Sequence, residues 1–444
     1  MKKSLILSNA VCCLLILFLS SQATARQLGA EDCHFYDHGQ PSADKVELGR
    51  MLFFDKILSG NMNISCATCH HPLVHTGDGL SLSIGEGGKG LSVTRVPLDI
   101  EGRVPRNAPA LWNLGAKEFV RMFHDGRVEV SDDPELNGFR TPAGPNLPEG
   151  LDNVLAAQAM FPVTSIREMA GVAEAAELHN EIADPASVRD FKEIWGRLAL
   201  RLQKNEAYVQ LFRKAFPDIG ASADITFVHA ANAIAAFESV TWRADNSPFD
   251  RYLRGDQEAM TMRQKKGMLL FYGHARCASC HKGTFQTDHE FHAIAMPQIG
   301  PGRGGVEPED IGRGEVMGPD EDYKFRTPSL RNVELNGPWG HDGAYNELEA
   351  VVRHHLNPQV ALQTYERNQA VLPSQGRDFQ DFNVLDDSSL TKHILEASDI
   401  DCICLSDYQA SLIIDFLHAL TDPASLDLRS IVPSEVPSKL IVAD

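Results

Sequence analysis

Basic residues are scarce in this chain of 444 residues. Lys and Arg together number 41 against 60 Asp and Glu, so the formal net charge is −19 with His neutral. An excess of negative charge repels the phosphates of nucleic acids and of anionic lipids. We therefore expect no nucleic-acid partner and no polybasic attachment to a membrane surface.

Long apolar runs are absent after the first segment. A basic start is followed by an apolar run over about residues 11–19, and then by Ala23 and Ala25, which form an A-x-A site. These are the three parts of a secretory signal, and the run is short for a membrane-spanning helix. We predict that residues 1–25 are a cleaved signal peptide, that the mature protein is periplasmic, and that it has no stable membrane span.

Stretches that alternate between polar and apolar residues are also absent. Apolar residues instead follow helical spacing over 186–216 and 224–242. A further helix is expected from Ser406, which has the spacing of a capping box with Gln409, to a point before Pro423. We therefore predict a mainly α fold with long irregular loops.

Cysteine is sparse, but four of the nine cysteines form two C-x-x-C-H motifs, at 66–70 and 277–281. Two thiols one helical turn apart can bond the vinyl groups of a haem, and the following His can bind its iron. Zinc sites and disulfides also use paired cysteines, but neither needs a His directly after both pairs. We predict two covalently bound c-type haems, held by Cys66, Cys69, His70, Cys277, Cys280 and His281.

Three other cysteines remain after the predicted signal peptide is removed, namely Cys33, Cys402 and Cys404. Exported proteins commonly form disulfides. We expect one structural disulfide among these three residues and one thiol left over.

Similar segments surround both haem motifs in the same order. The corresponding segments are 48–54 and 266–272, 106–113 and 326–332, and 123–126 and 340–343. Such self-similarity is typical of a repeated structural unit. We predict two cytochrome c-like domains related by internal duplication, an N-terminal one over residues 26–245 and a C-terminal one over residues 246–444.

Two haems in one exported chain allow two classes of function. A multihaem electron carrier needs two protein ligands on each iron, whereas an enzyme keeps one position open for its substrate. An acid–base group on the open side of one haem would distinguish the enzyme.

The chain resembles the bacterial di-haem cytochrome c peroxidases and their MauG-like relatives over roughly Val46 to Thr421. The motifs that carry the resemblance are LGRMLFFD, RNAPALWN, FHDGR, LAAQAMFPVTSIREM, SPFDRYL and FRTPSLRN. The resemblance implies a peroxidase that reduces hydrogen peroxide to water at the N-terminal haem. It equally allows a MauG-like oxidase that uses peroxide to oxidise residues of a partner protein.

The resemblance also implies partners. Electrons would come from a small cytochrome c or a cupredoxin through the C-terminal haem, and the family often forms homodimers. Cleavage of the signal peptide removes Lys2 and Lys3 and no acidic residue, which changes the formal charge from −19 to −21. A donor is therefore expected to dock through a basic face of its own.

The family's distal acid–base glutamate matches Glu168, and two distal-pocket positions match Gln158 and Pro162. A carboxylate within hydrogen-bond reach of bound peroxide can move a proton from one peroxide oxygen to the other. Many relatives also carry a displaceable distal His, and the matching position here is Glu86. The resemblance thus implies a first haem that is open in the ferric state.

The second haem also departs from the family pattern. Matching residue by residue places Gly337 where relatives carry a Met ligand. His341, His292 and Met317 are the alternatives that we weigh for the sixth ligand, with His341 favoured; a five-coordinate iron is the remaining option. Imidazole in place of a thioether would lower the potential of this haem.

Two further positions follow from the resemblance. His124 stands where relatives place a Trp between the two haems, and a His is a poorer carrier of oxidising equivalents than an indole. Asn107 matches a calcium ligand of the family, with the loop at 318–320 as a source of carbonyl ligands. A bound calcium ion is therefore expected between the domains.

Overall fold

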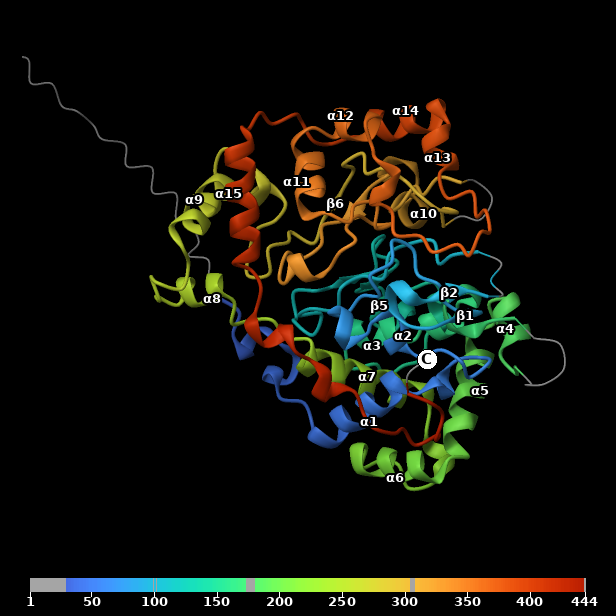
Figure 1. Cartoon of the computed structure of the whole chain (residues 1–444). Helices are drawn as coiled ribbons and strands as arrows, with labels where there is room; N and C mark the ends of the chain where they lie inside the picture. Colours follow the sequence, from blue (N-terminus) through green and yellow to red (C-terminus); the bar gives the residue numbers. More distant parts are fainter. Residues whose placement is uncertain (1–28, 99, 101, 173–179, 304–307, 443–444) are drawn as a thin grey trace, which may run out of the picture.

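The computed structural model describes residues 29–98, 100, 102–172, 180–303 and 308–442. It is mainly helical, as predicted, and its described strands are only two or three residues long (Figure 1). The predicted signal peptide lies outside the described residues. Within the described part, no helix is long and apolar enough to cross a membrane.

The helices and strands are connected by long loops and short 3₁₀ turns. The α-helices are α1 (Ala43–Phe54), α2 (Cys66–Cys69), α3 (Val154–Ala159), α4 (Ala183–Ser187), α5 (Phe191–Gln203), α6 (Glu206–Ala215), α7 (Phe227–Thr241), α8 (Pro248–Leu253), α9 (Met262–Tyr272), α10 (Gly314–Met317), α11 (Leu348–Leu356), α12 (Pro358–Gln363), α13 (Asn383–Asp386), α14 (Ser388–Glu396) and α15 (Asp407–His418). The strands are β1 (Gly88–Lys89), β2 (Val96–Pro97), β3 (Arg121–Met122), β4 (Val128–Val130), β5 (Phe139–Arg140), β6 (Phe291–His292) and β7 (Phe325–Arg326). All pair antiparallel, in the orders β1-β2, β3-β4-β5 and β6-β7.

The long helix expected over 186–216 is broken into α5 and α6, preceded by the short α4. The side chains of Asp190 and Asn205 each accept a backbone hydrogen bond at the start of the next helix. Such caps favour a new helix start over continuation. The helix predicted after Ser406 is confirmed as α15, with the expected capping box to Gln409.

In each half of the chain, the helix before the haem motif packs against a helix that follows the motif. In the first half α1 packs against α7, and in the second half α9 packs against α15. Gly49 of α1 and Gly267 of α9 lie so close to the partner helix that a Cβ atom would lie 1.9 Å and 1.8 Å from a carbonyl oxygen. The two halves thus share a packing contact at corresponding positions, while the duplication itself remains an inference from the sequence.

The end of the chain returns to the first half (Figure 1). Val436 is buried in the core of the first half, and Ser438 donates a hydrogen bond of 2.6 Å to the buried Asp55. Asp55 also accepts a hydrogen bond of 2.7 Å from Tyr208. The C-terminal tail therefore stabilises the half that carries the first haem motif.

The expected disulfide is wrong. Cys33, Cys402 and Cys404 are all exposed free thiols. The backbone of Cys33 is held by Lys117, whereas Ile403, between the other two cysteines, is bonded to Leu356. Cys33 is thus held in the first half of the chain, apart from Cys402 and Cys404 in the second half.

Alanine at either close-packed glycine should destabilise the protein. Gly49→Ala and Gly267→Ala would each push a methyl group into a backbone carbonyl, at a cost of about 1–3 kcal/mol or more. Gly196→Ala in α5 is the matched control, because no atom lies within 4 Å of its Cβ position. The control should gain about 0.5–1 kcal/mol from its helix preference. Urea unfolding followed by circular dichroism tests this, and equal stability of all three variants would contradict the packing.

Candidate functional site

The first haem motif begins with α2 and ends on a fixed imidazole. His70 donates a hydrogen bond of 2.8 Å from Nδ1 to the carbonyl of Thr76. The proton on Nδ1 leaves the lone pair of Nε2 free to bind a metal ion. Burial raises the pKa of both the Cys66 and the Cys69 thiol to about 12, so both are protonated at neutral pH. The segment therefore presents the two thiols and the imidazole nitrogen that haem attachment requires.

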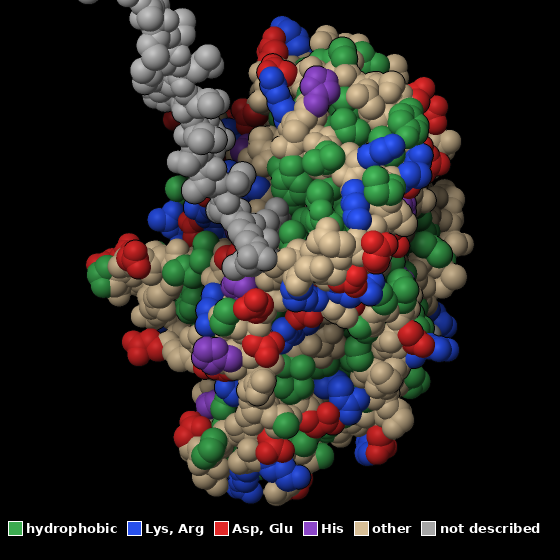
Figure 2. All heavy atoms as spheres, turned by 90° about the vertical axis from the view of Figure 1, so that its left-hand side faces the viewer, with side chains coloured by type: hydrophobic (Ala, Val, Ile, Leu, Met, Phe, Trp, Pro, Cys, Tyr) green, Lys and Arg blue, Asp and Glu red, His purple; other side chains and the backbone are tan. Residues whose placement is uncertain are grey.

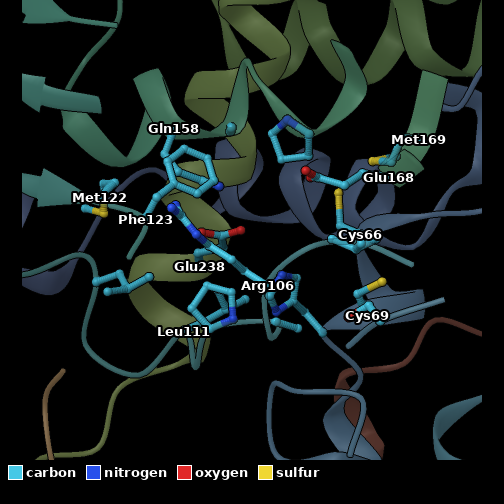
Figure 3. A pocket seen from close by; sticks show the side chains of 18 of the residues that line it. Cys66, Cys69, Arg106, Leu111, Met122, Phe123, Gln158, Glu168, Met169 and Glu238 are labelled. Carbon is cyan, nitrogen blue, oxygen red and sulfur yellow. The ribbon is translucent and has the colours of Figure 1, made fainter. Parts of the chain in front are cut away.

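These three side chains line a cavity in the first half of the molecule (Figure 3). The same cavity is lined by all the other residues predicted for the first site: Asn107, His124, Gln158, Pro162 and Glu168. They come from separate segments of the chain, so the fold brings together residues that the sequence motifs assigned one by one.

The side chains that line the cavity suit a haem, which has a large apolar ring and two carboxylates. Most of its surface is apolar, with side chains that include Leu58, Ile64, Leu111, Met122 and Ile234. The guanidinium of Arg326 also faces it and donates to the carbonyls of Phe123 and Thr327. In the described part of the chain no carboxylate pairs with Arg326, and burial lowers its pKa to about 10. A buried cation is costly without an anionic partner, and the carboxylates of a haem would supply one.

Glu168 lies in a single π-turn, Ile166–Ala170, where the Ser165 hydroxyl accepts a hydrogen bond from its backbone N–H. Burial raises the pKa of the Glu168 carboxyl, while Arg127 acts in the opposite direction. π-Turns are frequent at functional sites. Gln158 near the end of α3 and Pro162 contribute to the same cavity, so a carboxyl and an amide face one space.

Besides His70, the histidines near the first haem motif and its cavity have hydrogen-bond partners of their own. Only one further imidazole lines the cavity in the described residues, that of His124, and its Nε2 donates to the Asn107 carbonyl at 3.1 Å. Burial lowers the pKa of His124 to about 4, so its ring is neutral. His71 and His75 are hydrogen-bonded to Leu73 and Ser425, away from the cavity.

Glu86, at the position of the family's distal His, also lies outside the cavity. Its carboxylate accepts hydrogen bonds from the amides of Asn61 and Asn63. The position matched to the distal His therefore carries a residue with a structural role, and no ligand for the first haem comes from it. This agrees with a first site that is open to substrate.

A second buried carboxyl in the cavity was missed by the sequence analysis. Glu238 of α7 lines the cavity, and its Oε2 has no hydrogen-bond partner in the described structure. Burial raises its pKa to about 8. Its position within a helix of mostly apolar residues was the available signal, because a buried helix face rarely carries an unpaired Glu.

The second haem motif is built in the same way as the first. His281 donates from Nδ1 to the Gln286 carbonyl at 3.3 Å, which again leaves Nε2 free. The ring of His355, near the end of α11, lies with its centre 6.4 Å from the ring centre of His281. His355 donates from Nδ1 to the Val351 carbonyl at 2.8 Å, so its Nε2 is free as well.

This pair of rings fits one metal ion between them. Metal–imidazole bonds are about 2.0–2.1 Å long, so imidazoles on opposite sides of one ion have ring centres about 6 Å apart. The adjacent His354 is not a competitor, because Tyr345 and Ile294 occupy both of its nitrogens. His355 is therefore the residue that the structure places as a partner of His281.

The three sixth-ligand candidates from the sequence lie elsewhere. His341 stacks on Phe325 at 3.8 Å between ring centres, while Met317 is half exposed with its sulfur 3.2 Å from Arg140. His292 lies near Cys280, but its Nε2 is bonded to Asp288 at 3.0 Å. The sequence does not single out His355, because only the packing of α11 brings its ring beside that of His281.

Asn107 joins several segments at the boundary between the halves. Its side-chain amide donates to the carbonyls of Leu80 and Ser81 at 2.8 and 3.2 Å, and its backbone N–H donates to the carbonyl of His341. Backbone carbonyls are thus gathered around this residue. Calcium binding there remains a prediction.

Comparisons with known proteins agree with this site. The model of the di-haem cytochrome c peroxidase family matches residues 43–258. The methylamine utilization protein MauG of Methylorubrum extorquens is 33% identical over 316 residues, which are 70% of this chain and 69% of that protein. The cytochrome c551 peroxidase of Pseudomonas aeruginosa is 30% identical over 327 residues, which are 73% of this chain and 75% of that one.

Solved structures show the same fold. A MauG-like protein associated with microbial copper homeostasis superposes with a TM-score of 0.55 at 25% identity, over 88% of this chain and 93% of that one. The di-haem peroxidase BthA of Burkholderia thailandensis gives a TM-score of 0.56 at 19% identity, over 88% of each chain. The chain therefore belongs to the family of di-haem cytochrome c peroxidases and MauG-like proteins, and it is a haem-dependent oxidoreductase that acts on peroxide.

Proposed function

We propose that the protein is a periplasmic di-haem peroxidase that reduces hydrogen peroxide to water at the site of Cys66, Cys69 and His70. The observation that supports this most is the cavity in which Glu168 and Gln158 face the same space as the two thiols and the free His70 nitrogen. Electrons would enter from an external donor through the second site, held by Cys277, Cys280 and His281.

The chain would hold both haems covalently through the four thiols. Haem iron would supply a position for peroxide and the redox chemistry, with His70 as protein ligand at the first site and with His281 and His355 at the second. The structure supports different roles for the two sites, because only the first has a carboxyl and an amide beside it without a second free imidazole.

The acid–base work falls to Glu168. Reduction of one peroxide molecule to two waters consumes two electrons and two protons. Glu168 would take a proton from one peroxide oxygen and deliver it to the other, and its raised pKa favours the protonated form that can donate. The amide of Gln158 would orient the peroxide by hydrogen bonding, and the apolar wall of the cavity limits access of bulk water.

A MauG-like oxidase is the second candidate. It is favoured by one observation: Glu86, matched to the displaceable distal His of relatives, lies outside the cavity and is held by Asn61 and Asn63. An open ferric site can react with peroxide before any electron arrives, and the two oxidising equivalents would then be withdrawn from a residue of a partner protein.

Replacement of the proposed acid–base group should slow peroxide cleavage. Glu168→Gln keeps the size and removes the titratable carboxyl, and we expect a rate loss of about 100-fold or more with both haem spectra intact. Glu86→Gln is the matched control, because Glu86 is a half-buried carboxylate outside the cavity. Stopped-flow kinetics with peroxide measure the step, and full activity of Glu168→Gln would disprove the assignment.

The fully ferric protein should react with stoichiometric peroxide within milliseconds. Glu86, the residue matched to the displaceable distal His, lies outside the cavity, so no reduction step is expected to be needed to open the first site. Rapid-mixing absorbance spectroscopy shows whether the haem spectrum changes before a donor is added. A spectrum that changes only after one haem has been reduced would mean that a ligand blocks the first iron.

The ligand assignment at the second haem can be tested by spectroscopy. His355→Met should replace an imidazole signature by a thioether one in near-infrared magnetic circular dichroism, and it should raise the potential of this haem. His341→Ala and His292→Ala serve as controls and should leave the second haem unchanged. Loss of the native signature in His341→Ala, with His355→Met unaffected, would overturn the assignment.

A further inference from the structure

The segment before and within the second haem motif is basic in an otherwise acidic protein. Residues 261–283 contain five Lys and Arg and no Asp or Glu, whereas the whole chain has a formal charge of −19. The segment comprises α9 and the turn that carries the second pair of cysteines. The charge of this segment is therefore opposite in sign to that of the protein as a whole.

The outer side of α9 carries an apolar and basic stripe. Met262, Lys266 and Leu269 follow one another at i, i+4 and i+7, and the two apolar side chains are 67% and 69% exposed. The inner side is fixed by Gly267 and Phe271, which pack against α15. This stripe is therefore a stable exposed surface; its face is turned to the viewer in Figure 2, where hydrophobic side chains gather among Lys and Arg.

Three cations of this segment have no carboxylate partner. Arg263 is paired with Asp415 of α15 at 2.6 Å, and Lys265 is bonded to the carbonyl of Gln257. Among the residues that the structure describes, no ion pair involves the exposed Lys266, Arg276 or Lys282.

The carboxylates of the neighbouring elements change this little. Asp407 at the start of α15 is paired with Arg353 at 3.0 Å. Asp256 and Glu258 lie in the loop before α9, at the end away from the haem motif. Asp288 and Asp399 act electrostatically on Cys280, and they are held by the His292 ring at 3.0 Å and by the Ala293 N–H at 2.9 Å. Three exposed cations of the segment remain without a carboxylate partner among the described residues, and we name Met262, Lys266, Leu269, Tyr272, Arg276 and Lys282 the α9 surface.

The α9 surface lies next to the proposed point of electron entry. Cys277 follows the end of α9 by five residues, and Cys277 and Cys280 are only partly buried. A haem bound there would be attached directly beside this surface. Electron transfer between proteins weakens steeply with distance, so a donor seated on the α9 surface would be well placed.

We propose that the donor is an acidic one-electron carrier protein, whose negative face with an apolar centre docks on the α9 surface. The proposal rests on the proposed entry of electrons at the second haem. Each encounter transfers one electron from the reduced carrier to the second haem, so two encounters supply the two electrons that one peroxide requires.

This conclusion reverses the expectation from the net charge. Interactions between exposed charges further apart than about 8 Å are largely screened at physiological ionic strength. The acidic residues on distant faces therefore contribute little to a docked complex, whereas the cations of the α9 surface contact the partner directly. Unpaired Lys266, Arg276 and Lys282 favour negative charge on that partner.

The charge of the donor can be tested with two reduced single-haem cytochromes c of matched potential, one acidic and one basic. Each is mixed with the fully ferric holoprotein without peroxide, and reduction of the second haem is followed at several salt concentrations. We expect the acidic cytochrome to react faster and its rate to fall as salt rises. A faster reaction of the basic cytochrome, slowed by salt, would overturn the proposal and show that the overall negative charge governs docking.

Charge reversal locates the surface. The double variant Lys266→Glu, Lys282→Glu should slow reduction by the acidic cytochrome at least about tenfold at low salt. The matched control is Lys192→Glu, Lys214→Glu, which makes the same charge change on the exposed sides of α5 and α6. The control should react within about twofold of the parent protein. Equal slowing of both variants would show that the α9 surface is not the docking site.

The test separates this proposal from the proposed function. Reaction of the ferric protein with peroxide alone needs no donor and therefore reports on the first site. A protein that consumes peroxide but is reduced equally by both cytochromes would retain the peroxidase assignment and lose the acidic donor. If the protein is inert to peroxide but is reduced preferentially by the acidic cytochrome, the acidic donor is retained and the peroxidase assignment is lost.

Discussion

The buried guanidinium of Arg106 holds the two halves of the molecule together at the site. It bonds Asp310 of the second half through Nε and Nη2 at 2.7 Å each, and Asp125 of the first half through Nη1 at 2.6 Å. Despite burial, guanidinium charges hold the pKa of both carboxyls below their usual range: those of Arg127 and Arg106 at Asp125, and that of Arg106 at Asp310. Removal of one member of such a buried group leaves an unpaired charge and typically costs about 3–5 kcal/mol. The first cavity therefore depends on an interaction that neither half contains alone.

The boundary between the two halves, where Arg106 binds its two carboxylates, also contains two neutral imidazoles. His124 lies in the cavity wall beside Arg106, and His341 stacks on Phe325 with the Arg106 guanidinium 5.6 Å from the same ring. Burial lowers the pKa of His124 to about 4 and that of His341 to about 3. Since neither ring is charged near neutral pH, the charge balance at this boundary is set by the guanidinium groups of Arg106, Arg127 and Arg303 and by the carboxylates of Asp125 and Asp310. His124 thus contributes a hydrogen-bonding ring without adding a charge.

The sequence predicted those features of the fold and the site that depend on a few neighbouring residues. The two haem motifs, the capping box at Ser406 and the distal position of Glu168 are all written within a few neighbouring residues, and the structure places Glu168 in the expected cavity. Features that depend on distant contacts were not accessible. His355 becomes a candidate ligand only because α11 packs its ring beside His281, and the free thiols reflect where two separate segments come to lie, that of Cys33 and that of Cys402 and Cys404. The basic stripe on α9 was not accessible either, because net charge carries no information on where charges lie.

The two haem sites differ in the side chains that lie beside the imidazole of each attachment motif. Both motifs provide two thiols and an imidazole whose Nδ1 is fixed by a backbone carbonyl, so attachment alone cannot assign separate roles. Opposite the first imidazole lie a carboxyl and an amide, which can handle protons but leave an iron position open. Opposite the second lies His355, a strong ligand that would exclude peroxide and lower the potential. One site is thereby suited to substrate chemistry and the other to electron transfer, although the chain builds both from the same motif.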